Sequence, residues 1–231
     1  YVTGVQTCAL PISEQLKFTI IICGSYNMGK PDIIYEDNDI IVCCKPAGIA
    51  TQTRRIGQQD MESFIRNYRA AKNEPPYVGI VHRLDQPVEG VMVFAKNQKA
   101  AASLSRQIKE HTTEKYYRAA SRGQGVSGAD KQEDNHDPAW HTLTDYISFD
   151  KCTNTSKITS EKDRLAKKAV LQYRVISVTP DRDSSQNECI RTEFDIKLLT
   201  GRHHQIRLQL AHIGYPLIGD TKYGKPASNN S

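Results

Sequence analysis

The alternation of hydrophobic and polar residues predicts a chain of short strands and single helices. Over residues 32–46, apolar and polar residues alternate on either side of an Asn-Asp pair, which is the pattern of a β-hairpin. Over 58–71, apolar residues recur at i, i+3, i+4 and i+7, which predicts an amphipathic helix. A second helix is predicted from Asn97, a capping residue, to about Glu110.

The remaining apolar runs predict further strands and one short helix. A strand should lead up to His82, and others are expected over 91–96, 114–120, 167–178 and 189–199. The last run, "TGRHHQIRLQLAHIG", reads as a turn followed by a short helix that a glycine ends. The polar, glycine-rich stretch 122–140 should be an exposed loop. This mixture favours an α+β fold with a mostly antiparallel sheet flanked by helices.

Composition places the chain among ordinary globular proteins. Hydrophobic residues make up 38% and charged residues 25%, and the net charge of +5 is compatible with a nucleic-acid partner. A membrane span needs about 20 consecutive apolar residues, and the sequence contains no such run, so we expect no membrane association of that kind.

The six cysteines show neither a C-x-x-C pair nor the spacing of a metal site. Cys43 and Cys44 are adjacent in an apolar run, so they should point to opposite faces of a strand. We therefore expect reduced thiols, no bound metal and a cytoplasmic location.

The first 27 residues should not be part of the fold. The stretch "VTGVQTCALPI" resembles a translated sequencing-library adapter, and Met28 would be the natural start. A natural N-terminal strand or a weak signal peptide are the alternatives, although a signal peptide would need a basic region that is missing here. We therefore expect residues 1–27 to be a non-native adapter or leader and 28–231 to be the folded domain.

The stretch "VHRLDQPVEG" carries the first candidate chemistry. His82, Arg83 and Asp85 stand where an apolar strand ends and a turn begins. One interpretation is a capped turn with a salt bridge. The other is that Asp85 is a catalytic carboxylate.

The second candidate is the start of the last predicted helix. Arg202, His203, His204 and Gln205 crowd a helix N-terminus, where free N–H groups and the helix dipole favour a phosphate. A solvated basic helix start is the plain alternative. A metal site is disfavoured, because adjacent histidines diverge around a helix and no Cys or Glu completes a set. Arg207 lies on the same helical face as His204 and could pair with a buried carboxylate.

Taken together, these motifs resemble the RluA family of RNA pseudouridine synthases. The resemblance rests on "HRLD…G", on "K-x-Y-x-A" from Lys115, on "L-x-TGR-x-HQIR…AHIG-x-P-x-x-GD-x-x-YG" and on the opening "YEDNDIIVCCKPAG". It runs from about Pro31 to Gly224. It implies the pseudouridine synthase catalytic fold in 28–231, and an isomerase that converts a uridine of rRNA or tRNA to pseudouridine without a cofactor.

The resemblance also implies roles for individual residues. Asp85 matches the catalytic aspartate, Tyr117 the active-site tyrosine, and Arg207 the arginine that pairs with the aspartate. Arg83 matches the arginine that fills the space left by the flipped uridine. The remaining RNA contacts are expected from Lys45, His82, Arg202, His204 and Gln205. The partner would be structured RNA, and the protein would act as a monomer.

Two departures from the family pattern bear on function. Val88-Glu89-Gly90 stand where the family has Thr-Ser-Gly, which puts a glutamate near the expected RNA path. The chain also ends soon after "GDTKYG", where family members continue, so we expect a C-terminally truncated domain. A non-catalytic RNA-binding protein of the same fold, and a hydrolase that releases free uracil, therefore remain as alternatives.

Overall fold

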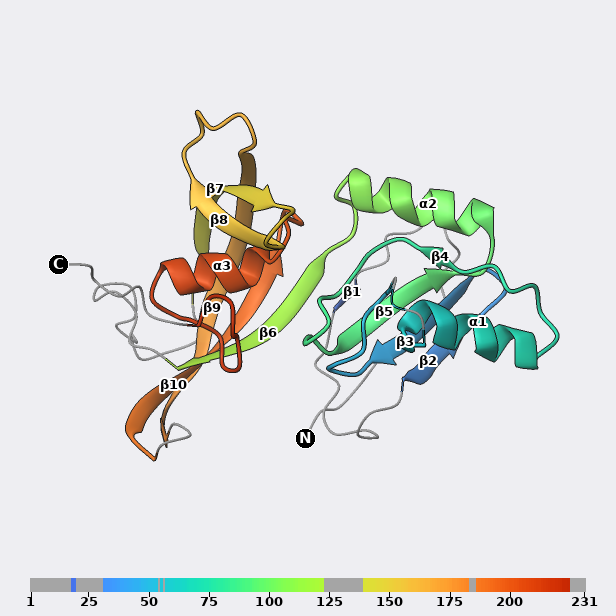
Figure 1. Ribbon diagram of the computed structural model, residues 1–231, viewed down its shortest axis with the longest axis horizontal. Helices are drawn as coiled ribbons and strands as arrows, with labels where there is room; N and C mark the ends of the chain where they lie inside the picture. The colour runs from blue at the N-terminus through green and yellow to red at the C-terminus, as the bar shows by residue number, and fades with distance from the viewer. Residues whose placement is uncertain are drawn as a thin grey trace. The chain divides into compact units, whose positions relative to one another are not determined.

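The computed structural model describes Phe18–Thr19, 31–53, 55, 57–122, 139–182 and 186–224 (Figure 1). Of the predicted leader, only the strand β1, Phe18–Thr19, belongs to these residues, and most of the loop predicted over 122–140 lies outside them. The chain divides into two compact units, Tyr1–Glu114 and Lys115–Ser231. We call these two parts of the chain unit 1 and unit 2.

Unit 1 contains an antiparallel sheet with the strand order β2-β3-β5-β4. The strands are β2 (Asp32–Glu36), β3 (Ile40–Lys45), β4 (Gly79–Ile80) and β5 (Gly90–Ala95). The predicted hairpin is confirmed, because β2 and β3 pair antiparallel. The Asp37 carboxylate closes its turn by accepting hydrogen bonds from the backbone N–H groups of Asp39 and Ile40, each at 2.8 Å.

Both predicted helices of unit 1 are present, and each begins at a side-chain cap. In α1 (Met61–Ala71), Asp60 and Ser63 form a reciprocal capping box. In α2 (Gln98–Lys109), Asn97 accepts a hydrogen bond from Ala100 N at 2.8 Å. These caps satisfy N–H groups that the first helical turn leaves without partners, which explains where the helices start.

The sheet of unit 1 buries side chains on both faces. Ala100 and Leu104 of α2 pack against one face. The other face carries residues no more than 1% exposed: Ile41, Cys43, Met92 and Phe94. Cys43 is buried and Cys44 partly buried, which confirms that they point to opposite faces, and neither forms a disulfide. Gly79 lets α2 approach closely, since a Cβ there would lie 2.9 Å from the Cβ of Ala101.

Unit 2 contains a second antiparallel sheet, with the order β6-β10-β9-β7-β8. Its strands are β6 (Lys115–Arg122), β7 (His141–Asp150), β8 (Thr155–Thr159), β9 (Lys167–Arg182) and β10 (Glu188–Leu198). We predicted β6, β9 and β10 but not β7 and β8. The short helix α3 (Gln205–His212) follows β10, as expected.

The two faces of this second sheet differ in character. One face packs against Leu210 of α3 and Tyr215, and it buries Leu171, Tyr173, Phe194 and Ile196. The other face is polar: Asp195 pairs with Arg118 and Arg174, each at 3.1 Å. A sheet with one apolar and one solvated face is typical of antiparallel architecture.

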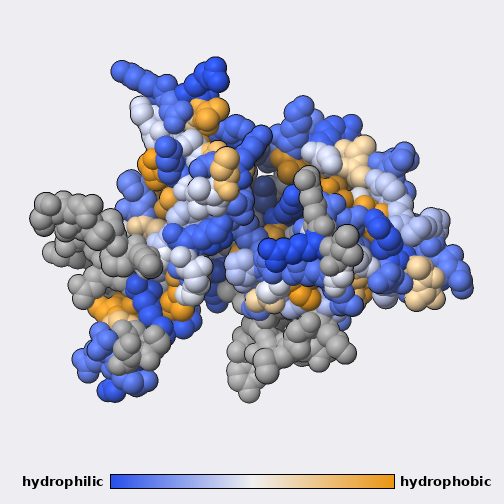
Figure 2. Space-filling model, viewed as in Figure 1, coloured by the Kyte–Doolittle hydropathy of each residue, from blue (hydrophilic) through white to orange (hydrophobic). Residues whose placement is uncertain are grey.

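The α+β class and the antiparallel pairing are confirmed, although the strands form two sheets rather than one. In the view of Figure 2, the surface is mostly hydrophilic, and apolar residues appear in small separate patches. None of the helices in the described part of the chain is long and apolar enough to cross a membrane.

Candidate functional site

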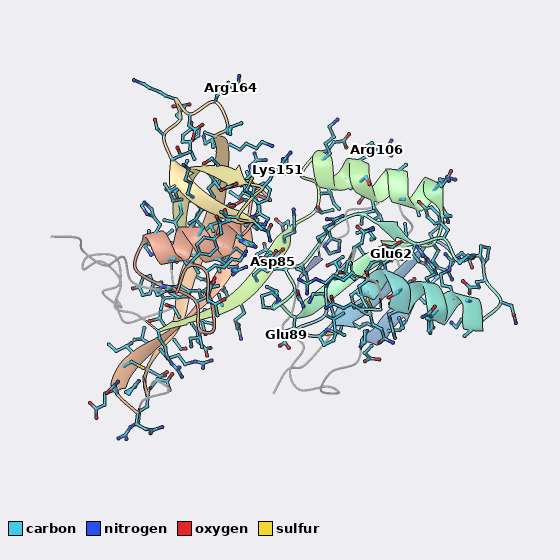
Figure 3. All side chains as sticks on the ribbon, in the orientation of Figure 1. Glu62, Asp85, Glu89, Arg106, Lys151 and Arg164 are labelled. Atoms are coloured by element: carbon cyan, nitrogen blue, oxygen red, sulfur yellow. The ribbon has the colours of Figure 1, made fainter. Side chains whose placement is uncertain are left out.

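Asp85 lies in unit 1, on the turn between β4 and β5 (Figure 3). The side chain is partly buried, and its backbone C=O accepts a hydrogen bond from Val88 N at 3.0 Å, which closes the turn. The strand that leads to this turn is shorter than predicted and ends at Ile80. One reason is that Nε2 of the His82 ring accepts a hydrogen bond from the Val93 N–H at 3.1 Å. This N–H of β5 therefore binds a side chain and is not available for a further backbone hydrogen bond between β4 and β5.

The His82 ring is therefore tied to the sheet through one of its nitrogens. We predicted an RNA contact for this residue. The ring is partly buried and its Nε2 is an acceptor, so the hydrogen bond to Val93 anchors the segment that carries Asp85.

Thr51 contacts the residue before Asp85. Its hydroxyl donates to the backbone C=O of Leu84 at 3.0 Å and accepts from the backbone N–H of the same residue at 3.2 Å. Thr51 and Leu84 are 4% and 6% exposed. This buried contact fixes the backbone on the N-terminal side of Asp85.

Lys45 contacts the residue after Asp85. Its ammonium is fully buried and donates to the C=O groups of Pro46 (3.0 Å), Ile49 (2.7 Å) and Gln86 (3.2 Å). The backbone N–H of Gly48 also donates to Gln86 O, at 2.8 Å. The RNA contact that we predicted for Lys45 does not fit this position, because all three protons of the ammonium already bind carbonyl groups.

Burial also changes the acidity of Lys45. The loss of hydration lowers the pKa of its ammonium from 10.5 to about 8, although the negative charge of Asp85 opposes this shift. Lys45 belongs to the support of the Asp85 turn rather than to an RNA-binding surface.

Arg83 and Glu89 are the exposed charges of this turn. Arg83 donates from Nη2 to Gln52 Oε1 at 2.7 Å and is otherwise open to solvent, as the predicted RNA contact requires. Glu89, labelled with Asp85 in Figure 3, is exposed at the start of β5. Gly90 follows with φ 151°, a conformation that residues with a Cβ disfavour.

Arg207 lies on α3 in unit 2 and forms a paired contact with Asp220. Its Nε donates to Oδ2 at 2.7 Å and its Nη2 to Oδ1 at 2.9 Å, and the two side chains are 13% and 4% exposed. Burial alone would raise the pKa of Asp220. Hydrogen bonds from Arg207 and from the N–H groups of Lys222 and Tyr223 outweigh it and lower the pKa from 3.8 to about 2.

Tyr223 connects this pair to the start of α3. Its ring lies 5.3 Å from the Arg207 guanidinium, and its hydroxyl accepts from Ser156 N at 2.8 Å and lies 2.9 Å from His204 Nδ1. His204 caps α3 in the left-handed region, with φ 53°. It is 9% exposed, so its predicted contact with RNA does not fit: its ring packs inside against Tyr223.

Gln205 also differs from its predicted place. It is 3% exposed, and its Oε1 accepts from Thr200 Oγ1 (2.9 Å) and from the backbone of Arg202 (3.0 Å). Its Nε2 donates to Gln209 Oε1 at 2.9 Å, and Gln209 in turn donates to Asp145 at 2.7 Å. The side chain of Gln205 thus holds the start of α3 to the sheet and does not reach solvent.

The other predicted residues of unit 2 keep positions nearer the surface. Arg202 is partly buried and donates from Nε to Lys168 O at 2.8 Å. Tyr117 is partly buried on β6, opposite Ile196, and packs against the core beneath α3. In the described ranges, no three His, Cys, Asp or Glu side chains come together as metal ligands.

Three supporting residues were not predicted: Thr51, Asp220 and Tyr223. Asp220 and Tyr223 belong to the "GD-x-x-YG" motif, whose carboxylate and hydroxyl could have suggested a partner for Arg207. Thr51 carries no comparable signal, because its partner is the backbone of a residue far along the chain.

Comparison with known proteins identifies the family. Residues 39–212 match the family model described as RNA pseudouridylate synthase. An uncharacterized RNA pseudouridine synthase of Bacillus subtilis, YhcT, is 32% identical and aligned over 85% of this chain and 58% of its own. Ribosomal large subunit pseudouridine synthase D of Borreliella burgdorferi is 31% identical over 84% of this chain and 54% of its own.

A shorter relative and two solved structures agree. The tRNA pseudouridine synthase C of Haemophilus ducreyi is 31% identical, and the match covers 84% of this chain and 74% of the relative. Human RNA pseudouridylate synthase domain containing 4 has a TM-score of 0.61 at 22% identity, covering 83% of this chain and 68% of that one. Domain containing 1 has a TM-score of 0.64 at 23% identity, covering 85% and 70%.

The chain thus spans between half and two thirds of the length of the first two relatives. The family match covers most of the chain and includes the Asp85 turn, Tyr117 and Arg207. The resemblance to the RluA-type enzymes is confirmed, and the chain belongs to the RNA pseudouridylate synthase family.

Proposed function

We propose that this chain is the catalytic part of an enzyme that converts a uridine in structured RNA, ribosomal or transfer, to pseudouridine, with Asp85 as the catalytic residue. The observation that carries the proposal is the construction of the Asp85 turn. Thr51 holds the residue before the aspartate, and Lys45 holds the residue after it. A carboxylate supported on both sides, within a family match over 39–212, is suited to a reaction that requires exact placement.

The proposed reaction rearranges bonds without a cofactor. The N1–C1′ glycosidic bond of uridine breaks, the uracil turns, and a C5–C1′ bond forms. The proton on C5 leaves and N1 gains a proton, so atoms balance with no other reactant. Asp85 acts either as the nucleophile or as the base that opens a glycal route. Tyr117 would stack on the uracil and take up the C5 proton as general base.

Arg207 is the proposed counter-charge for Asp85. An ionised carboxylate in a dry pocket is costly without a cation that both pairs with it and orients it. Asp220 occupies the edge of the Arg207 guanidinium formed by Nε and Nη2. A guanidinium has five N–H donors, so the same side chain can serve a second carboxylate with the remaining donors.

RNA recognition would use the exposed basic residues. A uridine within structured RNA must be flipped out before it can react, at a cost of a few kcal/mol. Arg83, at the surface beside Asp85, is the proposed residue that fills the vacated space, because a planar guanidinium stacks well. Arg202 is the proposed phosphate contact. Lys45, His204 and Gln205 have supporting roles instead.

The test is tritium release from RNA. Ribosomal and transfer RNA transcripts labelled at C5 of uridine are incubated with the protein, and pseudouridines are then mapped chemically. We expect release in proportion to pseudouridine formed, and no release above background with Asp85→Asn. RNA binding by Asp85→Asn should change little, since phosphate contacts provide most of the affinity.

Other results of this assay would indicate a different function. Free uracil in the medium would identify a hydrolase, because isomerisation keeps the base attached. RNA binding without release from any transcript would identify a non-catalytic RNA-binding protein. Release by Asp85→Asn at the wild-type rate would remove the aspartate from the mechanism.

A further inference from the structure

We propose that Thr51 is a positioning residue for the reaction: its hydroxyl sets the backbone that presents Asp85. The proposal rests on the function proposed above, and it adds a residue to which neither the sequence motifs nor the family match gives a role. Thr51 does not touch the reacting atoms and would act only through Leu84.

The contact is reciprocal and uses one oxygen. Thr51 Oγ1 donates to Leu84 O at 3.0 Å and accepts from Leu84 N at 3.2 Å. A hydroxyl has one proton and two lone pairs, so it can make both bonds at once. Valine, which has the same shape as threonine, cannot make either bond, because it lacks the oxygen.

These two bonds fix the peptide planes next to Asp85. Leu84 N belongs to the plane that joins Arg83 to Leu84, and Leu84 O belongs to the plane that joins Leu84 to Asp85. With both planes held, the rotation that remains at Leu84 is small. The direction of the Asp85 side chain therefore depends on Thr51.

Thr51 is itself rigidly placed. Its backbone C=O accepts from Glu62 N at 3.2 Å, in the first turn of α1, and the preceding Ala50 C=O accepts from Met61 N at 3.0 Å. The side chain is 4% exposed, and Met92 Sδ lies 3.7 Å from its hydroxyl. The hydroxyl thus transmits the position of α1 and of the sheet to the Asp85 turn.

Unit 1 also offers a matched control. Thr113 is 8% exposed, and its Oγ1 has no hydrogen-bond partner among the described residues. Thr51→Val and Thr113→Val make the same chemical change in buried threonines. Only the first removes hydrogen bonds from the Asp85 turn.

The experiment compares Thr51→Val, Thr51→Ser and Thr113→Val with the wild type. The probe is C5-tritiated RNA transcript, and the readouts are the single-turnover rate at saturating RNA and the Kd for RNA. We expect Thr51→Val to lower the rate at least about 10-fold, since a misplacement of about 1 Å can cost about 100-fold. The Kd should stay within about 2-fold, because the phosphate contacts remain. Thr51→Ser should restore the rate, and Thr113→Val should leave both readouts unchanged.

Two results would overturn the proposal. One is a folded Thr51→Val protein that turns over at the wild-type rate. The other is an equal loss in Thr51→Val and Thr51→Ser that follows a fall in the fraction folded, because the hydroxyl would then have no specific role.

A second measurement separates this proposal from the function. Hydrogen exchange at the Leu84 amide should be slow in the wild type and in Thr51→Ser, and faster in Thr51→Val. If the wild-type protein forms no pseudouridine, the proposed function fails, and with it the role in catalysis. Hydrogen exchange at the Leu84 amide would still show whether Thr51 fixes the turn.

Discussion

The Asp85 turn in unit 1 and the Arg207 pair in unit 2 hold a charged side chain in different ways. Around Asp85, Thr51 and Lys45 bind the backbone on either side and set the side chain indirectly. Arg207 is instead held through its own guanidinium, by the carboxylate of Asp220. A change beside Asp85 should therefore act through geometry, and a change beside Arg207 through charge.

The largest expected effect is that of Arg207→Ala. It would leave the carboxylate of Asp220, 4% exposed, without its cation. Breaking such a buried pair costs about 3–5 kcal/mol, and we also expect activity to be lost. Urea unfolding measures the stability, and tritium release measures the activity. Arg118→Ala is the control, since Arg118 is 53% exposed in its pair with Asp195 and should contribute about 0–1 kcal/mol. Equal effects of the two substitutions would contradict a special role for Arg207.

Asp220→Asn removes the negative charge of this side chain and keeps its shape. Losing charged hydrogen bonds should lower the free energy of unfolding by about 1.5–3 kcal/mol at neutral pH. Because the folded pKa of Asp220 is about 2 and its ordinary value is 3.8, its stabilisation is complete above about pH 4. It should disappear as the pH falls through 2. The difference between the wild type and Asp220→Asn should therefore shrink in acid, and a difference that is constant from pH 6 to pH 2 would show that folding does not lower the pKa of Asp220.

Lys45→Met tests the support that Lys45 gives to the backbone of the Asp85 turn. Near pH 7 the loss of three hydrogen bonds is offset by the relief of a buried charge, so we expect a net cost of only about 1 kcal/mol. The folded pKa of Lys45 is about 8 and the ordinary value is 10.5, so the unfolded chain binds more protons between these values. The wild type should therefore gain stability relative to Lys45→Met from pH 8 to pH 10.5. Urea unfolding of both proteins over this range measures the gain. Lys99→Met is the control, because Lys99 is an exposed lysine. A loss of wild-type stability relative to Lys45→Met over this range would mean that the fold stabilises the buried ammonium rather than destabilising it.

Arg83→Ala should have the smallest effect on stability. Arg83 is exposed, and its bond to Gln52 is open to water, so the free energy of unfolding should change by no more than about 0.5 kcal/mol. Activity should nevertheless fall, because the flipped uridine would lose the residue that fills its place. Thermal unfolding and tritium release together check this separation. A large loss of stability would assign Arg83 a structural role in the turn.

The sequence predicted the elements whose signals are local. The hairpin of β2 and β3 follows from alternation, and the starts of α1 and α2 follow from capping residues. Strand β7 was missed because Asp145 stands at an inward position of its alternating pattern. Its carboxylate accepts from Gln209 of α3, a partner that the sequence cannot reveal.

The same distinction applies to the candidate site. Asp85 and Arg83 could be singled out because their motif ends a strand and their neighbours are apolar. Lys45 and Gln205 were taken as RNA contacts because they match motifs of the family, yet both are buried and hydrogen-bonded inside the protein. Burial of a polar side chain depends on partners that are distant in the sequence, and these are set only when the chain folds.

The chain of hydrogen bonds beneath α3 restricts how this protein can change during evolution. Thr200, Gln205, Gln209 and Asp145 follow one another so that each donor meets an acceptor. The direction of one amide therefore determines the direction of the next. A mutation of Gln205 or Gln209 would leave a buried donor or acceptor of the other without this partner, whereas a coordinated replacement by apolar residues would not. These two positions should change together in a lineage or remain as they are.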